Sequence, residues 1–292
     1  MSSYLFALGA NISFSVASLV YMTFSRQVSA YWMNAFKAFV ALIASFFAVL
    51  MMGGFNDLAL NSLGAFLLSG FIGLAVGDLF LLSAFVRLGV TRSLVLFGFQ
   101  PVFLGFFGYL WLGQEMDASK LVAIVFLLGC LFLFSLENFK KTARWEIKGL
   151  LFALVAVLID SAGVLLSRYG FDNAPHIGAI EGHFYRCLSA VLGFFIFSQF
   201  YPLGLFKNLY RWSKKQQSLI VVASFAGTFL ALLLYLEAIK GGHLASVAAI
   251  GITGPMFAAI VECVYRKEWP SRYLLGAFTL FAAGFFILLG QS

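Results

Sequence analysis

Residues 64–86 read GAFLLSGFIGLAVGDLFLLSAFV, and Asp78 is the one charged residue in this run. A stretch of about 20 apolar residues has the length of a helix that crosses a lipid bilayer. The whole chain of 292 residues shares this character, because 62% of it is hydrophobic and only 11% is charged. Soluble domains carry roughly 25% charged residues. The composition therefore predicts an integral membrane protein and excludes both a soluble enzyme and a disordered chain.

The apolar stretches predict ten membrane-spanning helices, so the expected fold class is an all-α integral membrane protein. Strands of a membrane barrel would alternate apolar and polar residues over about ten positions, and no such alternation is present. The helices are expected at residues 4–24, 30–52, 64–86, 92–112, 119–137, 148–168, 177–200, 218–239, 246–265 and 273–290. The short gaps after the third and eighth helices predict tight helical hairpins.

The lysines and arginines divide unevenly between the two sets of alternate loops. One set holds only Lys120, Arg168 and Lys240, and the other set holds all the remaining basic residues except Lys37 and Arg186. Cytoplasmic loops carry the excess of positive charge, so the basic loops are expected in the cytoplasm and both termini outside. The chain is then a multi-pass protein of the inner (plasma) membrane. Its net charge of +7 faces lipid headgroups, and no nucleic-acid partner is expected.

The chain contains a weak internal duplication. Residues 5–8 (LFAL) match 151–154, Gly73 matches Gly227, and Pro101 matches Pro255. Each copy holds five helices, and an odd number means that the second copy enters from the opposite side of the membrane. The expected architecture is therefore two inverted five-helix repeats, residues 1–138 and 149–292, joined by a basic cytoplasmic connector at 139–148. Inverted repeats are typical of transporters with a site near the membrane midplane.

These features together resemble a known family. The stretch from Ala84 to Val102-Phe103 and then Leu112-Gly113-Gln114-Glu115 is similar to the signature that ends each half of the drug/metabolite transporter superfamily, EamA branch. The second half carries a similar stretch from Ala238 to Pro255, followed by Glu268. Lys37 and Arg186 fall where this pattern often places a basic residue on the second helix of each half. The resemblance implies a secondary transporter, and members are mostly exporters of amino acids and other small metabolites.

Two cations inside the apolar stretches are the first candidates for substrate binding. A charge at bilayer depth costs at least about 2.5 kcal/mol and normally faces a cavity or a partner. Lys37 and Arg186 could hold a carboxylate or phosphate, and arginine can do so with two parallel hydrogen bonds. A structural ion pair, or snorkelling of Lys37 to the interface, stays open as the other interpretation. Asn34, one turn before Lys37, and Asn11 and Gln100 would add hydrogen bonds.

Three titratable residues are candidates for proton coupling. Asp160 and Asp78 lie in apolar helices without a cation one turn away, and a desolvated carboxylate can exchange a proton near neutral pH. A salt bridge to Lys37 or Arg186 is the alternative for both. His183 could relay protons. Its neighbour Cys187 shares a helix face with it, but no second ligand pair exists, so no metal site is expected.

The remaining candidates are aromatic and proline residues. Tyr21, Trp32, Phe97 and Phe99 could form the wall of a cavity near the polar positions. Pro101 and Pro255 remove a helix hydrogen bond in the middle of a span, so they are candidate hinges, with a packed kink as the alternative.

The sequence thus predicts a secondary active transporter of small zwitterionic or anionic metabolites, with amino-acid export by alternating access as the leading function. Multidrug efflux of lipophilic cations is one alternative and would make Asp160 and Asp78 the binding groups. A non-transporting scaffold or lipid-handling protein is the other. Hydrolase, metalloprotease and nucleotide-binding motifs are absent, so no enzyme and no cofactor are expected. The expected partners are a small-molecule substrate and membrane lipid, and a homodimer stays open.

Overall fold

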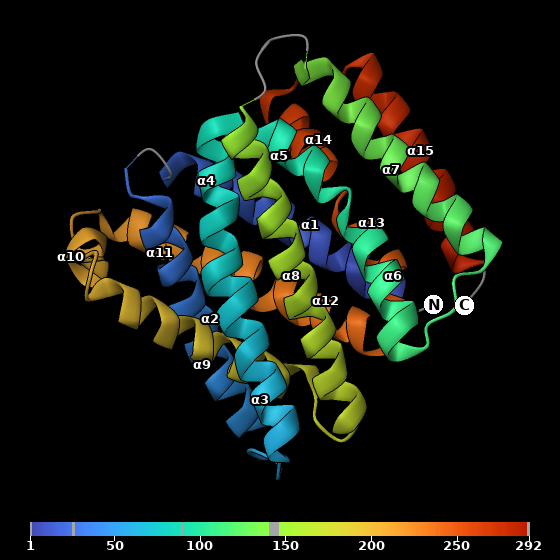
Figure 1. Cartoon of the computed structure of the whole chain (residues 1–292). Coiled ribbons are helices and arrows are strands. Elements are labelled where there is room, and N and C mark those ends of the chain that lie inside the picture. The colour runs from blue at the N-terminus through green and yellow to red at the C-terminus, as the bar shows by residue number, and fades with distance from the viewer. Residues whose placement is uncertain (1, 25–26, 89, 140–145, 291–292) are drawn as a thin grey trace.

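The computed structural model describes residues 2–24, 27–88, 90–139 and 146–290. Residues 140–145 of the predicted connector lie outside the described residues. Within the described ranges all regular structure is helical (Figure 1). Ten helical stretches are long and apolar enough to cross a membrane. The prediction of an all-α membrane protein with ten spans is confirmed.

The first half of the chain holds five spans. The first and second are α1 (Ser2–Phe24) and α2 (Ala30–Met51). The third joins α3 (Leu60–Ser69), the π-helix η1 (Gly70–Gly77) and α4 (Asp78–Leu88). The fourth is split into α5 (Val90–Phe97) and α6 (Gln100–Leu112), and the fifth is α7 (Ala118–Phe139).

The second half repeats this order. It begins with α8 (Ile147–Asn173) and α9 (Ala179–Ser198), followed by the short α10 (Leu205–Leu209). The eighth span joins α11 (Lys214–Ser224), the π-helix η2 (Phe225–Leu230) and α12 (Ala231–Gly241). The ninth is split into α13 (Leu244–Gly251) and α14 (Gly254–Arg266), and the tenth is α15 (Arg272–Leu289).

The two halves share the same departures from regular α-helix. A π-helical segment interrupts the third span and its counterpart, the eighth. The fourth and ninth spans break just before Pro101 and Pro255, each of which is the second residue of the helix that follows. Proline lacks a backbone N–H and clashes with the preceding turn, so it can begin a helix but not continue one. Whether either proline acts as a hinge stays a prediction.

Helices of one half pack mainly against helices of the other. The main pairs are α7 with α15, α2 with α9, α6 with α13, α1 with α12, and α4 with α8 (Figure 1). Gly129 of α7 lies against Leu280 of α15, and Gly276 of α15 against Leu133 of α7, so this pair runs antiparallel. Antiparallel packing of equivalent helices supports the inverted arrangement, which stays a prediction.

The third span approaches α8 closely because glycines face each other at the contact. A side chain on Gly163 would lie 3.3 Å from Cα of Gly73. Ser69 and Ser167 fasten the same contact, since their hydroxyls lie 2.6 Å apart. Small residues let membrane helices approach closely and hydrogen-bond across the contact. This packing places the start of α4 against the middle of α8.

Candidate functional site

Four charged side chains approach one another where the two halves meet, and we call them the central charge cluster. Lys37 comes from α2, Asp78 is the first residue of α4, Asp160 lies on α8 and Arg186 on α9. Electrostatic interactions join Lys37 to Asp78, Asp78 to Asp160, and Asp160 to Arg186. Each half thus supplies one cation and one carboxylate. The π-helix η1 ends directly before Asp78 and fixes where that carboxylate enters the cluster.

Arg186 is the most deeply buried member of the central charge cluster. Its side chain is 3% exposed. Two of its nitrogens, Nε and Nη1, are buried without a hydrogen-bond partner among the described residues. A buried donor without a partner costs about 1–3 kcal/mol, and more when it is charged. Within the described part of the chain, no carboxylate lies within the 4.0 Å of an ion pair with this guanidinium. Arg186 therefore has hydrogen-bond donors that the described residues leave unused.

Asp160 is held by a residue at the break in the fourth span. The side-chain amide of Gln100, the first residue of α6, donates a hydrogen bond to the Asp160 carboxylate. Tyr235 of α12 interacts electrostatically with both Asp160 and Arg186. Sequence reasoning missed Tyr235, because a single tyrosine in an apolar span carries no signal that separates it from packing residues.

Lys37 rests on an aromatic ring instead of a carboxylate. Its Nζ lies 5.2 Å from the centroid of the Tyr21 ring, within the range of a cation–π interaction. The Tyr21 hydroxyl donates to the carbonyl of Ala223 at 2.8 Å, which fixes the ring. Asn34 is buried one turn before Lys37 on α2. In the described ranges neither Lys37 nor Asp78 forms a hydrogen bond or an ion pair within 4.0 Å, so both groups keep bonding capacity.

Asn11 has a packing role in the structure. Its side-chain nitrogen donates to the carbonyl of Ile250 and lies 3.3 Å from the hydroxyl of Thr253. Ser15, one turn later, donates to the carbonyl of Gly254 at 3.0 Å. These contacts fasten α1 to the break between α13 and α14. The two halves are alike in this respect. Asn11 of α1 contacts the break in the ninth span, and Asp160 of α8 contacts Gln100 at the break in the fourth span. Substrate binding by Asn11 stays a prediction.

The other candidates lie at different depths. His183 is fully buried one turn before Arg186, and its ring nitrogens lie 3.7 Å from the sulfur of Cys187. Phe97 is half-buried at the end of α5, and Phe99 is 48% exposed in the break that follows. Trp32 is 1% exposed and packs against Phe36 and Trp212. The structure thus brings Lys37, Asp78, Gln100, Asp160 and Arg186 together, with Tyr21 beside Lys37.

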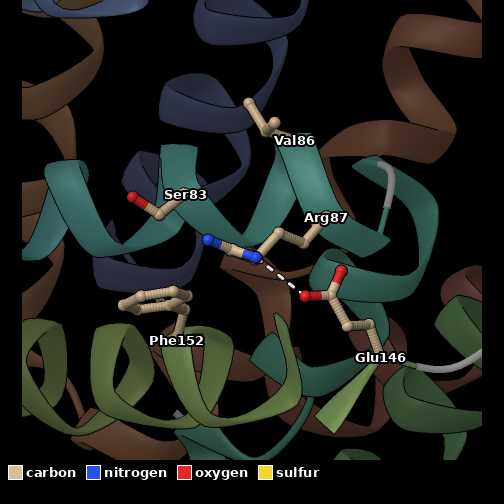
Figure 2. A pocket seen from close by; sticks show the side chains of 5 residues that line it. All are labelled: Ser83, Val86, Arg87, Glu146 and Phe152. Carbon is tan, nitrogen blue, oxygen red and sulfur yellow. Dashed lines mark hydrogen bonds and ion pairs between the residues drawn. The ribbon is translucent and has the colours of Figure 1, made fainter. Parts of the chain in front are cut away.

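A separate pocket lies at the far end of α4. Its volume is about 490 Å³, and Figure 2 shows the five residues that line it: Ser83, Val86, Arg87, Glu146 and Phe152. Arg87 and Glu146 form an ion pair at 2.7 Å across this pocket, and both side chains are more than one third exposed. The Arg87 guanidinium also lies over the Phe152 ring, 5.3 Å from its centroid. Arg87 is thus a paired arginine, in contrast to Arg186.

Ten spans in two similar halves that meet at buried charged groups are typical of membrane transport proteins. The family model of EamA-like transporters matches residues 1–136 and again residues 147–290. The chain belongs to the EamA-like transporter family. An uncharacterized transporter of Archaeoglobus fulgidus is 23% identical over 299 residues, which cover 99% of each protein. A crystal structure of another protein superposes with a TM-score of 0.80 over 99% of this chain and 98% of that one, at 16% identity, and so supports the fold.

Proposed function

We propose that the protein is a secondary active transporter that exports a small zwitterionic metabolite, with an amino acid as the leading candidate. The observation that carries this proposal is the buried guanidinium of Arg186, two of whose nitrogens have no hydrogen-bond partner among the described residues. Family membership supports a transporter in preference to an enzyme. We place the basic loops in the cytoplasm and both termini outside, because positive charge favours the cytoplasmic side.

A carboxylate is the group that best completes Arg186. The planar guanidinium presents its donors in a geometry that matches a carboxylate. Asp160 interacts with Arg186 from beyond ion-pair distance, and Gln100 holds Asp160 in place. A substrate carboxylate would therefore supply bonds to Arg186 that the described residues do not make. Tyr235 interacts electrostatically with both groups, and we propose that it contacts the same substrate.

The charge balance of the central charge cluster favours a zwitterion. Two cations and two carboxylates sum to zero when all four are ionised, and a zwitterion leaves this balance unchanged. Asp78, which makes no hydrogen bond in the described ranges, is the acceptor that we propose for the substrate ammonium. A lipophilic cation would add an uncompensated charge to a desolvated site, which is costly at bilayer depth.

Proton coupling would use one of the carboxylates of the central charge cluster. Asp78 faces Lys37 and Asp160, so a proton on Asp78 changes the balance of charge seen by both neighbours. Binding of the substrate ammonium and binding of a proton would then compete at Asp78. We propose this competition as the coupling step of alternating access between two states of the halves.

Solute counterflow in proteoliposomes tests the proposed function. Vesicles would be loaded with a pool of unlabelled amino acids, or with a pool of cationic drugs, and entry of labelled members of each pool followed. Wild type is compared with Arg186→Gln and with the control Arg87→Gln, which removes a paired arginine at the surface. We expect amino-acid counterflow that is lost in Arg186→Gln and kept in Arg87→Gln.

Other results would overturn the proposal. Counterflow of drugs alone, unaffected by Arg186→Gln, would move the binding role to Asp78 and Asp160. Absence of saturable counterflow for every pool, with folded protein in the vesicles, would favour a scaffold or lipid-handling role.

A further inference from the structure

Two contacts at opposite ends of the α2–α9 pair occupy equivalent positions in the two halves. Trp32 precedes Lys37 by five residues on α2, and Glu181 precedes Arg186 by five residues on α9. Each of these residues hydrogen-bonds the connection that follows the second span of the other half. We call the two contacts the Glu181 latch and the Trp32 latch.

The Glu181 latch fastens the connection between α2 and α3. Glu181 is 4% exposed, yet its carboxylate is fully engaged. One oxygen accepts the backbone N–H of Asn56 at 3.1 Å, and the other accepts the side-chain amide of Asn56 at 2.9 Å. His176, next to the start of α9, adds a hydrogen bond to the carbonyl of Asp57 at 2.9 Å. At this end of the α2–α9 pair, a polar contact therefore joins the two halves.

The Trp32 latch fastens the connection between α9 and α11. The indole N–H of Trp32 donates to the carbonyl of Leu205 at 3.2 Å. The ring is buried against Trp212 of the same connection, with ring centroids 5.3 Å apart. Trp212 also packs on Phe24 at the end of α1. At this end of the pair, aromatic packing and one hydrogen bond therefore join the two halves.

The positions of the latches show how they relate to the central charge cluster. α2 and α9 run antiparallel, because the end of α2 meets the start of α9 and the end of α9 meets the start of α2. Tyr31, next to Trp32, donates a hydrogen bond to the carbonyl of Phe194. Phe194 follows Glu181 by 13 residues on α9, so the two latches lie roughly 20 Å apart along this pair, at 1.5 Å per residue. Each lies roughly 7.5 Å along its own helix from Lys37 or Arg186. A helix that shifts when the substrate binds would thus move its latch with it.

We propose that the Glu181 latch and the Trp32 latch are the two gates of the transporter, and that transport opens one while the other stays closed. This inference rests on the alternating access that is part of the proposed function. It assigns Glu181 and Trp32 as gate residues that act at the ends of the path and do not touch the substrate at its central site. Because the two gates differ in chemistry, each can be weakened by a substitution that leaves the other unchanged.

Hydrogen exchange of the substrate-free protein in lipid nanodiscs tests the inference. The amide of Asn56 is itself a donor in the Glu181 latch, so peptides over residues 52–59 report that gate directly, and peptides over 203–212 report the other. Glu181→Gln removes a charge from one latch, and Trp32→Phe removes a single hydrogen bond from the other. Loss of one hydrogen bond shifts an equilibrium about fivefold.

The expected result is reciprocal. Glu181→Gln should raise exchange over 52–59 about fivefold or more and lower it over 203–212, because a larger share of the molecules then has the Glu181 latch open and the Trp32 latch closed. Trp32→Phe should do the reverse, and the double variant should return both segments toward wild type. Tyr185→Phe is the matched control, since the Tyr185 hydroxyl lies 3.5 Å from Glu181 and both Asn56 donors stay paired.

Either of two results overturns the inference. In the first, each variant changes exchange only in the connection that its own latch contacts, which would show two local contacts without coupling. In the second, both connections exchange faster in either variant and the thermal unfolding midpoint falls, which would show that the substitution destabilises the whole protein. The measurement needs no substrate, so a different cargo in the counterflow assay would leave the gate inference standing.

Discussion

Gly70 is the residue whose replacement should disturb the central charge cluster most strongly without removing a charge. It is the first residue of η1 and lies directly against the backbone of α9. A Cβ added at Gly70 would lie 2.5 Å from Cα of Arg186, and the carbonyl oxygen of Arg186 would be nearer still. Carbon atoms in contact lie about 3.5–4.0 Å apart. Gly70→Ala must therefore push η1 and α9 apart by roughly 1 Å.

The cost of this separation follows from its position. Overpacking a well-packed interior costs about 1–3 kcal/mol, and we expect the upper part of that range because backbone atoms cannot rotate away. The displaced backbone carries Arg186, so substrate binding should be lost together with stability. Gly64→Ala is the matched control on the same span, because nothing lies within 4 Å of its added Cβ. There, alanine should stabilise the helix by about 0.5–1 kcal/mol.

Thermal unfolding of both variants in one detergent, together with counterflow in vesicles, measures these effects. Gly70→Ala should unfold at a lower temperature than wild type and lose counterflow, whereas Gly64→Ala should match or exceed wild type in both. A Gly70→Ala protein with wild-type unfolding and flux would refute the close approach of η1 to α9. Equal losses in the two variants would show that any added methyl group on this span is harmful.

Three further predictions follow from single side chains. Asn11→Ala should cost about 1 kcal/mol of stability, as hydrogen bonds between membrane helices do, and should leave substrate affinity within twofold in a binding assay. A large loss of affinity with unchanged stability would instead support the substrate-binding role predicted for Asn11. Tyr235→Phe should weaken substrate binding with an unchanged unfolding midpoint, and unchanged affinity would remove Tyr235 from the site. Burial and the nearby Lys120 lower the pKa of His243, between α12 and α13, to about 4 from an ordinary value of 6.5. The unfolded chain binds a proton on His243 more readily than the folded chain does. The stability that neutral His243 contributes is therefore present above pH 6.5 and is lost as the pH falls toward 4. Unfolding midpoints at pH 7 and pH 4.5 should therefore differ less in His243→Gln than in wild type, and an equal difference would contradict the assignment.

Much of the architecture was predictable from the sequence, because lipid imposes simple constraints. A backbone in hydrocarbon must satisfy its own hydrogen bonds, so long apolar stretches can only be helices. For the same reason, charges within those stretches had to face one another or a cavity. Lys37, Asp78, Asp160 and Arg186 were identified on this argument, and the structure brings them together.

The remaining features depend on packing between residues far apart in the chain. The π-helices η1 and η2 each meet another helix at a glycine, Gly70 against α9 and Gly227 against α1, and apolar sequence alone does not show them. Trp32 resembles any aromatic residue near a span end, and its contact with Leu205 depends on how α10 folds back. For Asn11, the polarity of its span fits either a cavity or a packing seam, and the sequence does not separate the two. The structure shows its packing contacts with Ile250 and Thr253.

The central claim is that the Arg186 guanidinium binds the substrate carboxylate. Two ligands that differ only in that carboxylate test the claim most directly. Binding of the amino acid that shows the strongest counterflow would be measured by calorimetry beside its carboxamide, which keeps the ammonium and loses the anionic charge. Hydrogen bonds to a charged group are worth about 1.5–3 kcal/mol, so wild type should prefer the acid by roughly 10- to 100-fold. Arg186→Gln should bind both ligands with nearly equal affinity. A variant that keeps the wild-type preference for the acid would contradict the account.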